Sequence, residues 1–154
     1  MQSASATQTA ASPTVTRRRL LVLVGGPFPG HGDDRASLVL ARARGAEALV
    51  VAPTLPVAGE RWVIDLDARE SRARANLRSW VDALAGQAAS VRGELGDENP
   101  DLAVADALDG FAADEFLDAL VPGGPSPARR APLEQLHDLF ASARGAPDMR
   151  ARHA

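Results

Sequence analysis

Apolar positions are gathered into short runs along this chain, and four of these runs predict β-strands. Residues 20–24 are apolar without interruption, which is typical of a strand buried on both faces of a sheet. Residues 49–52 form a second run of this kind, which is closed by Pro53. Weaker runs at residues 91–95 and 116–121 predict a third and a fourth strand.

Apolar residues at helical spacing separate the predicted strands. The Gly- and Pro-rich residues 25–32 follow the first strand, and Asp33 or Asp34 can then cap a helix that ends at Gly45. The apolar stripe of this helix consists of Ala36, Val39, Leu40 and Ala43. We therefore expect this stripe to face the sheet.

Three more helices are predicted from the same signals. Asp67 and Glu70 form an Asp version of the capping box and open a long helix. Its apolar stripe holds Ala73, Leu77, Trp80, Val81 and Leu84, and its polar face, which we expect to be solvated, holds Arg69, Arg72, Arg74 and Arg78. Asn99 caps the next helix and Pro100 is its first residue, while Pro132 opens the last one.

Strands and helices thus alternate in the order β-α-β-α-β-α-β-α. Strands joined by single helices need right-handed crossovers, so the order predicts an α/β fold with a Rossmann-like, parallel open sheet and helices on both faces. We assign residues 17–144 to this single domain. Residues 1–16 and 145–154 are predicted to be disordered tails, and the three arginines at 17–19 a solvated lead-in to the first strand.

Composition narrows the range of functions. The 154 residues carry a net charge of −3, and all 17 basic residues are Arg, so we expect no general binding to nucleic acid. The chain has no Cys, which excludes disulfides, thiolate metal sites and cysteine nucleophiles. It has no apolar run near the roughly 18 residues of a membrane span and no secretory signal at its start. We therefore expect a cytoplasmic protein with no membrane contact.

The segment 91–108 carries a family resemblance. It reads Val-Arg-Gly-Glu-Leu-Gly-Asp-Glu-Asn-Pro and continues into a helix rich in Ala and Leu. Together with the strands at 20–24 and 48–53 and the Arg-rich helix, it resembles the universal stress proteins, and the chain looks like a divergent member from Arg17 to about Val121. The resemblance implies a binding or interaction module of the stress response without catalytic activity.

The nucleotide motifs of that family are incomplete in this chain. Family members that bind ATP place an Asp after the first strand and a Gly-x-x-Gly-x9-Gly-Ser/Thr loop after the fourth, whereas this chain has Gly-Gly-Pro at the first position and no Gly-Ser or Gly-Thr pair at the second. We therefore expect no strong binding of ATP, and the sequence leaves another nucleotide, a homodimer and a protein partner open. The candidate ligand-binding residues are Gly25, Gly26, Gly30, Gly32, Pro53, Gly123, Gly124 and Ser126.

A metal site is the alternative interpretation of the loop after the first strand. His31, Asp33 and Asp34 are similar to the His-Pro-Asp-Asp motif of zinc-dependent sugar N-deacetylases, in which a His and an Asp hold zinc and the second Asp is a base. Such a site needs a His-x-x-His pair, and only His137 and His153 follow. We favour helix capping by the two carboxylates. A third alternative is a structural partner that binds no small molecule.

Overall fold

The computed structural model describes residues 15–56 and 65–120. The predicted last helix, the loop around Trp62 and nearly all of both predicted tails lie outside these residues. The described elements are β1 (Arg19–Val24), α1 (Asp34–Ala43), β2 (Glu47–Pro53), α2 (Leu66–Ala85), β3 (Ser90–Gly96), α3 (Pro100–Gly110) and β4 (Glu115–Ala119). No helix within the described ranges is long and apolar enough to cross a membrane.

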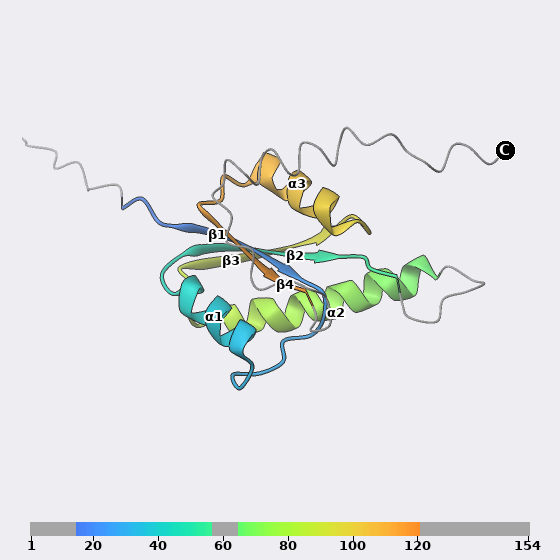
Figure 1. Ribbon diagram of the computed structural model, residues 1–154, viewed down its shortest axis with the longest axis horizontal. Coiled ribbons are helices and arrows are strands. Elements are labelled where there is room, and N and C mark those ends of the chain that lie inside the picture. The colour runs from blue at the N-terminus through green and yellow to red at the C-terminus, as the bar shows by residue number, and fades with distance from the viewer. Residues whose placement is uncertain (1–14, 57–64, 121–154) are drawn as a thin grey trace, which may run out of the picture.

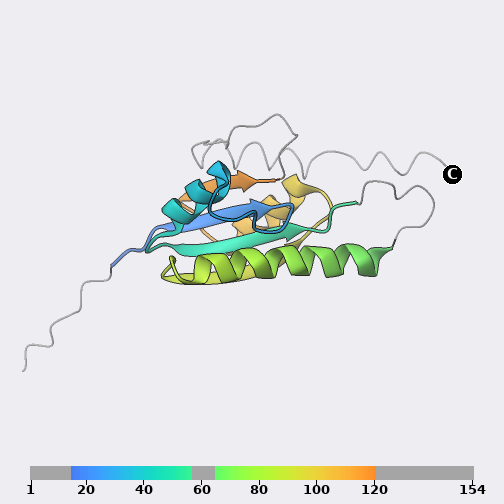
Figure 2. The same cartoon turned by 90° about the horizontal axis from the view of Figure 1, so that it is seen from below.

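The four strands form one parallel sheet in the order β3-β2-β1-β4. The chain moves outward from β1 to β2 and β3, and it then returns to the other side of β1 to form β4. Because crossovers are right-handed, this reversal places α1 and α2 on one face and α3 on the other (Figures 1 and 2). The prediction of a parallel open sheet with helices on both faces is confirmed.

Strand β1 has neighbours on every side and forms the centre of the core. Leu20, Val22 and Val24 belong to the apolar cluster beneath α1 and α2. Leu21 and Leu23 point the other way and belong to the cluster beneath α3. All five are at most 3% exposed, and burial of each such side chain contributes about 1.5–3 kcal/mol. The apolar run at 20–24 therefore reflects burial on both faces.

The helix starts are specified by side-chain caps, and one of the three predicted caps is wrong. Asp33 caps α1 and accepts a hydrogen bond from the backbone N of Ala36, and Asn99 caps α3. Helix α2, however, is capped by Asp65, which accepts from the backbone N of Ala68 at 2.9 Å. Asp67 lies in the first turn of α2, where its charge still complements the helix dipole.

Two glycines of β3 let the helices pack directly on the sheet. A Cβ atom added to Gly93 would lie 2.9 Å from the Leu77 side chain of α2. A Cβ atom on Gly96 would lie 2.5 Å from the Cβ of Ala103, which belongs to α3 on the opposite face. The Ala103 methyl group has no rotamer with which to move away, so α3 can approach this strand only because residue 96 has no side chain.

Substitution Gly96→Ala should separate α3 from the sheet and destabilise the protein by about 1–3 kcal/mol, as overpacking of a core does. Gly86→Ala is the matched control, because Gly86 has a φ of −82° and no atom within 4 Å of an added Cβ. That variant should be neutral or up to about 1 kcal/mol more stable. Urea unfolding measures both, and equal stability of the two variants would contradict this packing.

Candidate ligand-binding site

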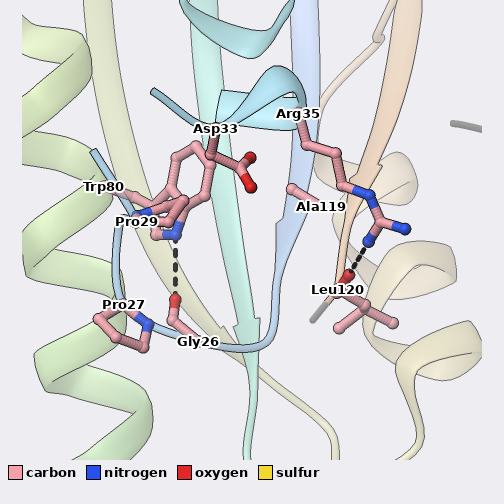
Figure 3. A pocket seen from close by; sticks show the side chains of 8 residues that line it. All are labelled: Gly26, Pro27, Pro29, Asp33, Arg35, Trp80, Ala119 and Leu120. Atoms are coloured by element: carbon pink, nitrogen blue, oxygen red, sulfur yellow. Dashed lines mark hydrogen bonds between the residues drawn. The ribbon is translucent and has the colours of Figure 1, made fainter. Parts of the chain in front are cut away.

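The strand order reverses between β1 and β4, and a cavity lies at the carboxyl ends of these two strands. In open parallel sheets ligands bind at such a point, because the crossover helices leave it on opposite faces. The cavity has a volume of about 240 Å³. We call it the switch-point cavity, and its described lining consists of Gly26, Pro27, Pro29, Asp33, Arg35, Trp80, Ala119 and Leu120 (Figure 3).

One wall of the switch-point cavity is the loop between β1 and α1, which is fastened to α2. The indole Nε1 of Trp80 donates a hydrogen bond to the carbonyl oxygen of Gly26 at 3.0 Å (Figure 3). The backbone N of Phe28 donates to the Ser79 hydroxyl at 2.9 Å. The Phe28 ring meets the Trp80 ring edge to face, with the centroids 5.1 Å apart. Helix α2 therefore fixes the loop by hydrogen bonds and ring contacts.

The opposite wall is the end of β4, and two charged side chains fix its course. The Leu120 backbone N donates to the carboxylate of Asp118 at 2.9 Å. The Leu120 carbonyl oxygen accepts from the Arg35 guanidinium of α1 at 2.6 Å (Figure 3). The predicted fourth strand extended to residue 121, whereas β4 ends at Ala119, which pairs with the last residue of β1. The Asp118 side chain takes the next backbone N–H, that of Leu120.

The chemistry of the switch-point cavity is mainly apolar with a charged rim. Trp80, the prolines, Ala119 and Leu120 supply apolar surface, while Asp33 and Arg35 supply the charges. The Asp33 carboxylate already accepts the N–H of Ala36, so its position is set by helix capping. Such a site suits a planar ring with polar substituents at its edge.

A second cavity of about 190 Å³ lies beyond the carboxyl end of β2. We call it the α2 cavity, and its described lining consists of Gly25, Pro53, Leu55, Pro56, Arg69, Arg72, Ala73 and Asn76. Arg69 was expected on a solvated face of α2, and this expectation is wrong: the residue is 7% exposed. It lies four residues before the buried Ala73 and therefore extends the apolar stripe.

The chain matches no protein-family model, and it matches no curated protein. Among solved structures it is similar to the universal stress protein from Archaeoglobus fulgidus. The identity is 24%, the match covers 66% of this chain and 73% of that protein, and the TM-score is 0.46. The structural match is thus to a protein of the family that the sequence resembles.

Three of the eight predicted ligand-binding residues belong to the described lining of the two cavities. Gly26 lines the switch-point cavity, and Gly25 and Pro53 line the α2 cavity. Gly30 and Gly32 lie in the loop between β1 and α1 but do not occur in the described lining of either cavity; Gly30 has a φ of +98°, which favours glycine. The remaining predicted residues, Gly123, Gly124 and Ser126, lie outside the described part of the chain.

The alternative metal ligands have other contacts. The ring of His31 lies against Phe28, with the centroids 5.6 Å apart, while Asp33 caps α1 and Asp34 begins it. Across residues 15–56 and 65–120, no group of three or more His, Cys, Asp or Glu side chains could hold a metal ion. The prediction that the carboxylates serve the helix start is confirmed for Asp33 by its hydrogen bond to Ala36.

Several residues of the two cavities were not predicted from the sequence. Trp80 was predicted as core, and it is 2% exposed, but it also lines the switch-point cavity. Arg35 and Asn76 had no local signal, because a cavity becomes evident only when distant segments are placed together. Arg69 did have one: its spacing to Ala73 and Trp80 puts it on the buried side of α2.

Ser79→Ala tests how the loop between β1 and α1 is held. The substitution removes the acceptor of the Phe28 N–H, so we expect a loss of about 1 kcal/mol and faster hydrogen exchange at that amide. Ser71→Ala, at an exposed position of the same helix, should be neutral or slightly stabilising. If the Phe28 amide exchanged equally fast in both variants, α2 would not hold the loop.

Proposed function

We propose that this protein is a universal stress protein-like module that binds a small molecule in the switch-point cavity and performs no reaction on it. The cavity is the observation on which the proposal rests. It lies where the strand order reverses, and its lining residues come from the loop between β1 and α1, the start of α1, the helix α2 and the end of β4. The assignment to a stress response rests on the sequence resemblance.

The size and lining of the cavity indicate the kind of ligand. Complete small-molecule sites usually have about 300–1,000 Å³, so a cavity of about 240 Å³ suits one ring system and not a large cofactor. Pro27 and Pro29 are exposed and offer apolar surface to such a ring, and the nearly buried Trp80 indole contributes a small part of the lining. Asp33 and Arg35 lie at the lining with opposite charges, which suits a heterocycle with both donor and acceptor groups.

Hydrogen bonds that hold the cavity walls in place support the proposed binding. The Trp80 indole and the Arg35 guanidinium both hold backbone carbonyl groups of the lining, Gly26 and Leu120, across large separations in the sequence. Walls that are set before the ligand arrives lower the entropic cost of binding. The expectation of no strong ATP binding remains a prediction from the sequence, since it rests on the lack of a Gly-Ser or Gly-Thr pair after the fourth strand.

Adenosine is a suitable probe, because it carries a planar ring and no phosphate. In a Trp62→Phe background, adenosine should change the fluorescence of Trp80. At about 100 times its dissociation constant it should add about 2.7 kcal/mol of stability, which raises the melting temperature by several degrees. Ala119→Leu should fill the cavity and weaken adenosine binding at least tenfold.

Ala112→Leu is the matched control, because Ala112 is exposed and lies before the amino end of β4, whereas the cavity lies at the carboxyl end of that strand. It should bind adenosine as the parent does. Unchanged fluorescence and melting temperature in the parent, or equal affinity of the two leucine variants, would contradict ring binding in the switch-point cavity.

A further inference from the structure

The α2 cavity is built on one face of a helix. Four of its lining residues, Arg69, Arg72, Ala73 and Asn76, follow one another at intervals of three, one and three positions, which places them on a single stripe of α2. The stripe lies in the first half of the helix. Gly25 and Pro53, at the ends of β1 and β2, form the other side of the cavity. The ends of β1 and β2 and one face of α2 therefore form the walls of the α2 cavity.

Arg69 is an unusual component of such a stripe. Its side chain is only 8% exposed, whereas that of its ion-pair partner Glu98 is 42% exposed. The Nη1 atom of Arg69 lies 3.2 Å from the Glu98 Oε2 atom. Removing a guanidinium from water costs several kcal/mol unless the charge is paired, and the Glu98 carboxylate is one of the groups that stabilise it. The fold thus keeps a positive charge at a cavity wall where an apolar side chain would continue the stripe.

The charged side chains in the described lining of the α2 cavity are both guanidinium groups. Its described lining has two guanidinium groups, the amide of Asn76 and apolar side chains, and it includes no carboxylate. Guanidinium groups present parallel N–H donors whose spacing fits the oxygens of phosphate or carboxylate. The amide adds a further donor at the same stripe. The donor groups and the charge of this lining match an oxyanion.

We propose that the α2 cavity is an oxyanion-binding site in which Arg69 and Arg72 hold a phosphate or carboxylate group. Arg69 supplies a fixed charge from within the fold, and Arg72 closes on the oxyanion from the exposed side. The Asn76 amide donates to a remaining oxygen. The inference does not depend on ring binding in the switch-point cavity. The two cavities are nevertheless neighbours, because Gly25 lines the α2 cavity and the next residue, Gly26, lines the switch-point cavity.

The test is calorimetric titration of the full chain with inorganic pyrophosphate and, separately, with succinate. Arg72→Gln should weaken binding of the preferred anion about tenfold or more, which corresponds to one charge-assisted hydrogen bond. Arg72 is exposed, so this variant should fold normally. Arg74→Gln is the matched control: it removes the same charge from the same helix, but Arg74 pairs with Glu70 and is not among the described lining residues. The anion that binds more tightly identifies the oxyanion as phosphate or carboxylate.

Glu98→Gln provides a second test with the opposite sign. Removing the carboxylate that faces Arg69 should strengthen anion binding about threefold or more, because the charge of Arg69 is then less neutralised. Failure of both anions to bind, equal losses in the Arg72 and Arg74 variants, or weaker binding in Glu98→Gln would overturn the proposal. Adenosine binding should be unchanged in Arg72→Gln, so failure here is distinguishable from failure of the switch-point cavity.

Discussion

The burial of β1 on both faces and along both edges is the constraint on which this structure depends. Because β2 and β4 flank it and helices cover both of its faces, every side chain from Leu20 to Val24 must be apolar. The same arrangement has a second consequence. Helix α1 leaves β1 on one face of the sheet and α3 enters β4 from the other face (Figure 1), and the switch-point cavity lies at the carboxyl ends of these two strands.

The elements of the fold were predictable because their signals are local. A strand buried on both faces has a continuous apolar run, and α1 shows its stripe and its cap within a few residues. The predicted cap of α2 was wrong because Asp65 and Asp67 both have the right chemistry, and only the course of the chain before the helix selects Asp65. Likewise β4 was predicted too long, since a run of apolar residues does not reveal that the pairing with β1 ends at Ala119.

The cavities were less predictable, because they depend on contacts between distant residues. Trp80 and Gly26 are 54 positions apart, and Arg35 and Leu120 are 85 apart, so neither hydrogen bond leaves a pattern in the sequence. Of the glycines after β1, Gly25 lines the α2 cavity and Gly26 lines the switch-point cavity. Arg69 was misjudged because a charged residue was assigned to the polar face by its type, although its spacing placed it on the buried stripe. At a candidate site, position on the helix was the better guide.

The central claim is that a ring binds where β1 and β4 diverge, and nuclear magnetic resonance of the full chain tests it most directly. The claim predicts that adenosine gives nuclear Overhauser contacts to the Trp80 indole and to the Ala119 methyl group, because both line the switch-point cavity. The largest amide shift changes should then fall at Gly26 and Leu120. Contacts confined to residues away from this cavity, or no contacts at saturating adenosine, would contradict the claim.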